Sequence, residues 1–415
     1  MRYEMKYGTE IKSVEIPEEN VLQVILPSDV PSNTDQKRIV REALDHPVGT
    51  GKMEDIFGAK DTVTIVTSDI TRPLPSYTVL PPVVEELHKI GIKDEQITIM
   101  FAIGSHRHHT EEEMAKLVGK DLYDRIRCVD SDPEKCALIG TTESGTPIEI
   151  DERLLKTDRI ICLGNVEYHY FAGYSGGIKA IFPGCATRAT IQNNHRHMVE
   201  PGAVAGNLLH NPVRDDLEEI LKLIKVDFIV NVVLNPRKEV IYAAAGDVIE
   251  AHRDACAYLD SIYHVDIHEK ADIVIASQGG SPKDLNLYQT QKALDNTKYA
   301  IKDGGVIILV GSCKEGFGES HFEEWMLKYD ADEMIHHIRE NFILGAHKAA
   351  AIALVKKQAD IYLLSDFPEE IVRKTFLEPV HDLQEAYKKA QEKFGGKGTV
   401  ILMPYAGSTL PCLKE

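Results

Sequence analysis

The sequence predicts an α/β protein with two α/β domains and mostly parallel sheets. Short runs rich in β-branched residues recur along the chain, and amphipathic helical patterns lie between many of them. Strands that alternate with helices favour parallel sheets covered by helices. At 415 residues the chain is also too long for a single ordinary core.

The individual elements follow from these patterns. We expect strands at residues 63–67, 97–103, 159–163, 228–234, 272–277, 305–310 and 399–403, and helices at 79–90, 213–224, 248–262, 285–300 and 382–394. One helical pattern ends and a new strand begins near residues 264–272, which is where we expect the domain boundary. The predicted domains are therefore residues 1–265 and 266–415.

The composition excludes several classes of partner. The 65 acidic side chains outnumber the 47 basic ones, and the net charge of -18 would repel nucleic-acid phosphates and anionic lipid. We therefore expect no nucleic acid and no membrane as a partner. The seven cysteines form no CxxC pair and are odd in number, which favours a reducing compartment over a disulfide framework. Without an apolar signal core or a membrane-spanning stretch, the expected location is cytoplasmic.

Several predicted strands end in polar or glycine-rich segments. These segments are SDITRP (68–73), GSHRHH (104–109), GNVEYH (164–169) and SQGGSPKD (277–284). In open α/β sheets, ligands bind at the carboxyl ends of the strands. We therefore expect the functional residues in these four loops.

A glycine-rich segment ending at Lys179 is the most informative stretch. Gly173, Gly176 and Gly177 allow a close backbone approach to a ligand, and consecutive N–H groups at a helix start suit an anion. No Ser or Thr follows the lysine, so this is not a magnesium-nucleotide loop. Lys179 could neutralise a phosphate or act as an amine nucleophile that carries a covalent group. A purely structural turn is equally compatible with the segment alone.

Histidines form a second group of candidates. His106, His108 and His109 follow a predicted strand, His169 precedes the glycine-rich segment, and His195 and His197 follow it. Imidazoles can exchange acid and base roles near neutral pH, and they also bind nickel, copper or zinc. A zinc hydrolase built on the first three histidines is one alternative, although neither HExxH nor a suitably spaced carboxylate is present. A lone histidine is more often a hydrogen-bonded or surface residue.

Two further segments could bind an anionic substrate. Arg72 lies with Asp69 in a proline-restricted loop, where a guanidinium could hold a carboxylate through two hydrogen bonds. A structural Asp69–Arg72 turn explains this segment equally well. Tyr288, Gln289 and Lys292 lie at the start of a predicted helix, where Tyr288 and Lys292 share one face. The plain alternative for them is a solvated helix surface.

Taken together and in this order, SDITRP, GSHR, EYHYFAGYSGGIK, NNH and GGSPKDLNLYQTQK resemble the nickel-dependent lactate racemase family and its relatives acting on other 2-hydroxy acids. The resemblance implies a nickel pincer nucleotide as cofactor. This group is a pyridinium-3-thioamide-5-thiocarboxylic acid mononucleotide that holds Ni(II). The resemblance also implies that separate biosynthetic enzymes must supply it.

The same resemblance implies roles for individual residues. Lys179 would carry the covalently attached cofactor, His195 would be the nickel ligand, and His106 and His169 would form the acid/base pair. The active site would lie in the cleft between the N-terminal domain, with the histidines and Lys179, and the C-terminal domain, with substrate-binding residues. The remaining implied contacts are Asp69, Gly173, Ser175, Gly176 and Gly177 for the cofactor, and Arg72, Tyr288, Gln289 and Lys292 for the substrate.

The expected activity is inversion of C2 in lactate or a related hydroxy acid or sugar acid, by reversible hydride transfer to the cofactor. Two alternatives stay open: the zinc hydrolase and a non-catalytic sensor of hydroxy acids. The sequence departs from the family at His108 and His109, where a proline or apolar residue is expected, and at GGIK instead of GGRK or GGAK. The sequence leaves open the substrate, a homo-oligomeric state, and the roles of His108, His109 and Trp325. For Trp325 a core position is favoured.

Overall fold

The computed structural model describes residues 1–28, 30–31, 35–104 and 106–414. The chain folds into two α/β units. A central unit comprises residues 29–262, and a terminal unit combines residues 1–28 with 263–415. The predicted fold class, two α/β domains with mostly parallel sheets, is confirmed. The predicted division at residue 265 put the first 28 residues in the N-terminal domain, whereas they belong to the terminal unit.

The central unit is built on a six-stranded sheet in the order β13-β12-β9-β4-β5-β6. Its first five strands along the chain pair in parallel, and only β13 is antiparallel to its neighbour. The strands are β4 (Val63–Ser68), β5 (Ile97–Ala102), β6 (Arg127–Asp130), β9 (Arg159–Val166), β12 (Phe228–Leu234) and β13 (Val240–Gly246). Because β4 pairs in parallel with both β5 and β9, the carboxyl ends of these three strands lie at one edge of the sheet.

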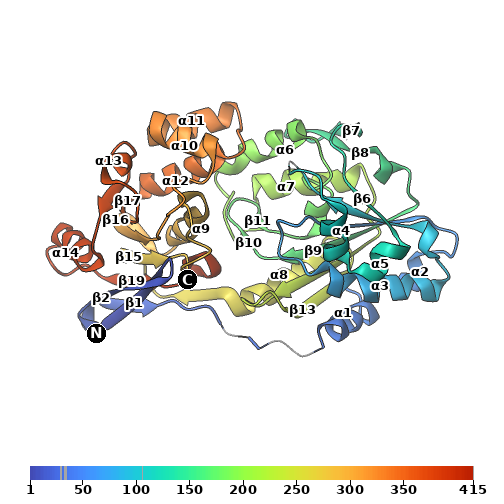
Figure 1. Cartoon of the computed structure of the whole chain (residues 1–415), viewed down its shortest axis with the longest axis horizontal. Coiled ribbons are helices and arrows are strands. Elements are labelled where there is room, and N and C mark those ends of the chain that lie inside the picture. The colour runs from blue at the N-terminus through green and yellow to red at the C-terminus, as the bar shows by residue number, and fades with distance from the viewer. Residues whose placement is uncertain (29, 32–34, 105, 415) are drawn as a thin grey trace. The chain divides into compact units, whose positions relative to one another are not determined.

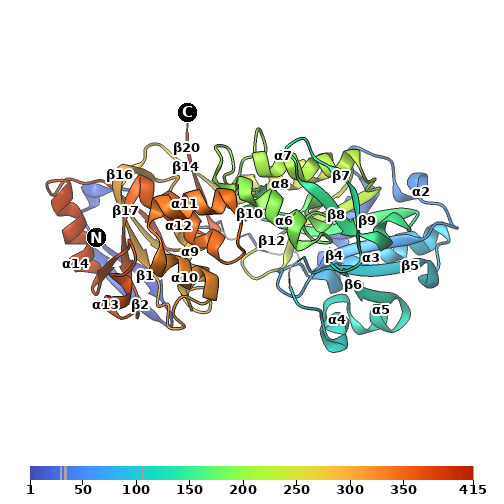
Figure 2. The same cartoon turned by 90° about the horizontal axis from the view of Figure 1, so that it is seen from above.

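Helices cover one face of this sheet and enclose a hydrophobic core. Apolar side chains of α1 (Gln36–Asp45), α2 (Met53–Ile56), α3 (Ser76–Ile90), α4 (Glu111–Val118) and α5 (Lys120–Arg125) pack against alternating residues of the strands. Ile65, Ile99 and Leu163 are at most 1 % exposed there. Figure 2 shows α4 and α5 next to one another beyond β6. The predicted helix at 79–90 is thus present and begins three residues earlier.

The opposite face carries the segment that contains Lys179. In it, β10 (Tyr168–His169) and β11 (Gly173–Tyr174) form a short antiparallel pair, followed by the 3-10 helix η4 (Gly177–Ala180). Gly176 approaches Gly164 of β9, and the Cys185 thiol contacts Met100 of β5, so the segment lies directly on the sheet. The remaining strands and α-helices of this unit are β7 (Cys136–Thr141), β8 (Pro147–Asp151), α6 (Arg188–His195), α7 (Pro212–Glu218) and α8 (Glu250–Tyr263).

The terminal unit contains a second six-stranded sheet, and all its strands pair in parallel in the order β18-β17-β16-β15-β19-β3. The strands are β3 (Val21–Val24), β15 (Ala271–Ser277), β16 (Ile301–Val310), β17 (Ala359–Leu364), β18 (Glu378–Val380) and β19 (Val400–Met403). Its helices are α9 (Leu287–Thr297), α10 (Ser320–Lys328), α11 (Ala331–Glu340), α12 (Ala346–Gln358), α13 (Glu369–Val372) and α14 (Leu383–Lys393). A further parallel pair joins β14 (His264–Ile267) to β20 (Leu410–Leu413).

The first residues of the chain are part of this second sheet and its core. Strand β3 pairs with β19. The hairpin of β1 (Arg2–Tyr7) and β2 (Glu10–Glu15) packs against the second sheet. Met5 and Val14 are at most 1 % exposed and join the core around Ile308. In Figure 1, the blue strands β1 and β2 lie beside β15 and β19, which come from the other end of the chain. Local patterns could not reveal this pairing because it joins residues far apart in sequence.

All seven cysteines lie in the described part of the chain and are free thiols. Among the described residues, no helix is both long and apolar enough to cross a membrane.

Replacing a core residue of the second sheet should destabilise the terminal unit. Ile308 of β16 is fully buried, and Ile308→Ala should lower the free energy of unfolding by ~2–5 kcal/mol because it leaves a cavity. Ile11, which is 59 % exposed in the same unit, provides the matched control. Urea unfolding followed by circular dichroism should show a change below ~0.5 kcal/mol for Ile11→Ala. Equal effects of the two substitutions would contradict the assigned core.

Candidate active site

Side chains with acid, base or anion-binding chemistry gather at one edge of the central sheet. Asp69 and Arg72 follow β4, His106 follows β5, and His169 follows β9. The order of these strands in the sheet brings the three loops together. The sequence predicted functional residues at this edge. Asp69, Arg72, His106 and His169 do lie there.

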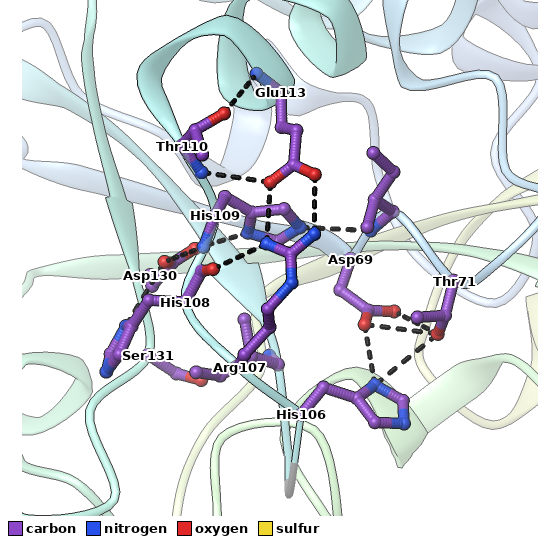
Figure 3. Close-up of polar contacts among 12 residues, drawn as sticks. Asp69, Thr71, His106, Arg107, His108, His109, Thr110, Glu113, Asp130 and Ser131 are labelled. Carbon is purple, nitrogen blue, oxygen red and sulfur yellow. Dashed lines mark hydrogen bonds and ion pairs between the residues drawn. The ribbon is translucent and has the colours of Figure 1, made fainter.

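Asp69 and His106 form a hydrogen-bonded pair (Figure 3). The His106 Nδ1 atom lies 2.6 Å from Asp69 Oδ2, and the Thr71 hydroxyl donates to both Asp69 oxygens at 2.9 and 3.1 Å. Burial favours the neutral carboxyl, but the hydrogen bonds from His106 and Thr71 outweigh it and lower the pKa of Asp69. The carboxylate therefore accepts the Nδ1–H proton of His106. A neutral His106 then presents Nε2 as its proton-accepting nitrogen.

His169 is held in the opposite tautomer. The Ala172 backbone N–H donates to His169 Nδ1 at 3.3 Å, so the proton of the neutral ring is on Nε2. The ring stacks on Tyr170 and meets Phe171 edge-on. Burial is the main reason that the pKa of His169 lies well below its usual value, and positive charge on the nearby Lys179, His195 or Arg72 lowers it further. The residue therefore stays neutral at physiological pH.

Lys179 lies in η4 and is half-buried. Burial is the main reason that its pKa falls well below the usual lysine value, and the positive charges of Arg214 and Arg72 add to the effect. A lysine with a lowered pKa loses its proton more readily, and the neutral amine can act as a nucleophile. The environment of Lys179 therefore suits a covalent attachment through its side chain.

Arg214 of α7 is fully buried and holds the backbone ahead of Lys179. Its guanidinium donates to the carbonyl oxygens of Ala172, at 3.2 Å, and of Tyr174. Its burial lowers its own pKa to about 10, so it remains a cation. Sequence reasoning missed this residue because its partners lie some 40 positions earlier in the chain.

The three glycines ahead of Lys179 are packed against protein atoms. A Cβ atom on Gly173 would overlap the Asn207 carbonyl, and one on Gly176 would lie 2.7 Å from Asn231 Oδ1. Gly176 and Gly177 have φ values of 79° and 60°, which side chains rarely adopt. The Gly177 N–H donates to Asn231 Oδ1 at 2.8 Å. The glycines thus shape the backbone around Lys179, and their expected contacts with a cofactor stay predictions.

Ser175 also has protein partners. Its hydroxyl donates to the Asn165 carbonyl at 2.8 Å, and its own carbonyl accepts a hydrogen bond from His252 Nε2 at 2.8 Å. His252 is fully buried under the loop. The side chain of Ser175 is therefore used to fold the loop, and its expected cofactor contact likewise stays a prediction.

His195 is the last residue of α6 and is 8 % exposed. Its Nδ1 lies 2.9 Å from Asn194 Oδ1, which can only accept, so Nδ1 carries the proton. Asn194 is itself fixed because its amide donates to Asp216 at 2.8 Å. This arrangement leaves Nε2 as the nitrogen with a lone pair, as in a histidine that binds a metal. The Lys179 amine, whose pKa is lowered, and this imidazole fit a covalently held nickel group.

The predicted substrate residues of the terminal unit lie at the start of α9. Asn286 caps the helix by accepting the Gln289 N–H at 3.0 Å. Gln289 and Lys292 are exposed, whereas Tyr288 is half-buried. The Lys348 amine donates to the Tyr288 carbonyl at 2.7 Å and lies 4.0 Å from the centre of its ring. Lys348 anchors this helix start, and no local sequence signal connected it with a residue 60 positions earlier.

The histidines proposed for a zinc site do not converge on a common point. His108 Nδ1 and His109 Nδ1 both face Asp130, at 3.2 and 2.6 Å, while His106 binds Asp69. Both ring nitrogens of His109 have protein partners, since Nε2 accepts the Ile70 N–H. Within the described ranges, no group of three or more His, Cys, Asp or Glu side chains could hold a metal ion. The zinc hydrolase alternative therefore has no geometric support.

Trp325 occupies a core position, as favoured from the sequence. It is 4 % exposed in α10 and packs edge-on against Tyr329, with ring centres 5.5 Å apart.

Comparisons with known proteins show the family of this chain. Residues 7–206 match the lactate racemase N-terminal domain, and residues 267–409 match the lactate racemase C-terminal domain. The lactate racemase of Thermoanaerobacterium thermosaccharolyticum is 34% identical over 97% of both chains. The chain belongs to the lactate racemase family. It is thus an isomerase of the racemase class, as the sequence predicted.

A second curated relative and two solved structures are also similar to the chain. The lactate racemase of Lactiplantibacillus plantarum is 31% identical over 89% of both chains. The structure of the lactate racemase apoprotein from T. thermosaccharolyticum matches with a TM-score of 0.90 at 31% identity and covers 100% of both chains. A crystal structure of a Thermotoga maritima protein shares the fold, with a TM-score of 0.63 at 20% identity, and covers 94% of this chain and 100% of its own.

The lowered pKa of Lys179 predicts unusual reactivity of its amine. Only the neutral amine reacts with an acylating reagent, so labelling of Lys179 should reach half its maximal rate well below the pH required for surface lysines. Peptide mapping by mass spectrometry after acetic anhydride pulses at different pH values measures this. Arg72→Gln removes one neighbouring cation and should move the midpoint to higher pH. A Lys179 midpoint equal to that of surface lysines would disprove the assigned environment.

Proposed function

We propose that this protein racemises a small 2-hydroxy acid, with lactate as the first candidate, and that it does so with a nickel pincer nucleotide held by Lys179 and His195. The observation that carries the proposal is the cluster of His106, His169 and Lys179 in a member of the lactate racemase family. The low pKa of Lys179 supports its covalent role, and the tautomer of His195 supports metal binding through Nε2.

The two catalytic histidines offer complementary groups to a substrate oxygen. His106 presents an unprotonated Nε2, because Asp69 holds its Nδ1 proton, and it can take the proton from the substrate hydroxyl. His169 presents Nε2–H and can hold the same oxygen by donating a hydrogen bond. When bound, the cofactor supplies reversible hydride acceptance at C2, which erases the stereocentre. The residues of the chain position the hydroxy acid substrate and control the proton of its hydroxyl group.

The long hydrogen bond at His169 suits a change of protonation there. Inversion in the opposite direction requires His169 to act as the base, so its Nε2 must lose the proton. Its partner, the Ala172 N–H, lies 3.3 Å away, which is at the weak end for a hydrogen bond. The proton can therefore be relocated in His169 at smaller cost than in His106, whose Nδ1 faces a carboxylate at 2.6 Å.

We propose Arg72 as a substrate-binding residue, and we propose the same role for Tyr288, Gln289 and Lys292. A guanidinium binds a carboxylate through two parallel hydrogen bonds, and an ammonium adds a point charge. Gln289 and Lys292 are exposed at a helix start that Lys348 and Asn286 hold in place. Enzymes that build the cofactor are required as maturation partners.

Co-expression with a nickel-pincer biosynthesis pathway tests the proposal. The wild-type protein should carry a nickel-containing mass adduct on Lys179 and racemise L-lactate, as measured by chiral chromatography. Lys179→Ala should lose both the adduct and the activity. His106→Asn should keep the adduct but lose at least about 100-fold in kcat, because it removes the base. Full activity of protein with an unmodified Lys179 would refute the proposal.

Arg72→Lys should raise KM for the hydroxy acid by about 10- to 100-fold, because one charge remains while the paired hydrogen bonds are lost. Arg38→Lys, on the exposed surface of α1, is the matched control and should leave KM unchanged. Initial rates at varied substrate concentration measure the difference. An unchanged KM in Arg72→Lys would exclude Arg72 from carboxylate binding.

A further inference from the structure

His109 connects two parts of the central unit through its imidazole ring. Its Nδ1 lies 2.6 Å from Asp130 Oδ1, and its Nε2 accepts the Ile70 N–H at 3.0 Å. The side chain is 1% exposed, and its ring lies 5.0 Å from that of Phe101. Figure 3 shows this ring next to Asp130 and close to the loop that carries Asp69. His109 therefore links the end of β6 to the loop after β4.

The Ile70 N–H belongs to the peptide group that joins Asp69 to Ile70. The carbonyl of the same peptide group accepts the Arg72 N–H at 3.1 Å. A peptide group is planar, so a hydrogen bond on each side fixes its orientation. That orientation sets the direction of the Asp69 side chain toward His106 and the turn that leads to Arg72.

Asp130 provides the fixed end of this connection. It is the last residue of β6, and its side chain is 5% exposed. Its carboxylate accepts the backbone N–H of His109 at 2.8 Å in addition to the ring proton. Strand β6 pairs in parallel with β5, so Asp130 is held by the sheet itself. The link thus runs from the rigid sheet to an otherwise exposed loop.

We propose that His109 is a positioning residue for the acid/base pair: it fixes the Asp69–Ile70 peptide so that the Asp69 carboxylate holds His106 in its proton-accepting tautomer. The inference rests on the proposed function, because it assumes that His106 is the base. Only a neutral imidazole can donate from one edge and accept on the other. The proline or apolar residue expected here from the family could not make both contacts.

The first test uses the apoprotein and needs no activity. In His109→Leu, the Ile70 amide should exchange with solvent about 10-fold faster, because its hydrogen bond is lost. The Nδ1 proton resonance of His106, which the Asp69 contact protects, should also disappear. Both are measured by NMR. In His109→Gln, whose amide oxygen replaces Nε2 as acceptor, Ile70 should keep most of its protection. His108 also contacts Asp130, but its side chain is 64% exposed. The control variant His108→Leu should change neither the Ile70 exchange rate nor the His106 resonance.

The second test is a double-mutant cycle in the cofactor-loaded enzyme. His109→Leu should lower kcat by about 10- to 100-fold through misplacement of the base. In an Asp69→Asn background the same substitution should lower kcat by less than about 3-fold, because His109 acts through Asp69. His109→Gln should restore much of the activity.

Three outcomes would overturn the inference. The first is an unchanged rate of Ile70 amide exchange in His109→Leu. The second is an equal loss of kcat from His109→Leu in the wild-type and Asp69→Asn backgrounds, and the third is an equal loss of kcat in His108→Leu. Failure of the proposed function would look different: His106→Asn would retain activity, while the apoprotein measurements would still report on the His109 link.

Discussion

The parallel pairing of β4 with both β5 and β9 is the constraint on which the candidate site depends. It places the ends of three strands at one edge of the central sheet, and the loops that follow carry Asp69, His106 and His169. The pairing itself is stabilised by buried β-branched side chains on both faces of the strands. A change of register in β4 would move Asp69 away from His106, so the chemistry of the site depends directly on the packing of the core.

Positive charge around Lys179 is the second physical feature of the site. Arg214 is buried, Arg72 lies on a nearby loop, and both lower the pKa of Lys179. Arg214 lies 3.8 Å from the Glu218 carboxylate, whereas Arg72 is exposed. Burial is the main reason that the pKa values of Lys179 and His169 are lowered, and the two arginines add to the effect, which favours an amine nucleophile and a base. The same charges would attract an anionic cofactor or substrate.

The histidines show how one residue type acquires different roles from its neighbours. His106 faces a carboxylate, His169 receives a backbone N–H, and His195 donates to an amide oxygen. Each contact assigns the ring proton to one nitrogen and the lone pair to the other. His109 uses both nitrogens for contacts with the protein, which explains its burial beside the site.

Local sequence patterns determined the α/β class, the positions of seven strands and five helices, and the loops that carry the candidate site. Strand 228–234 matches β12 completely, and the histidine and glycine motifs were found because they lie next to predicted strand ends. Periodicity and turn residues are local signals, so a single sequence contains them. Tertiary structure alone decided which distant residues meet: β3 with β19, Arg214 with the loop before Lys179, and His109 with the Ile70 backbone. Those contacts also decided the ring tautomers and the packing of the glycines, because both depend on atoms that only the folded chain brings together.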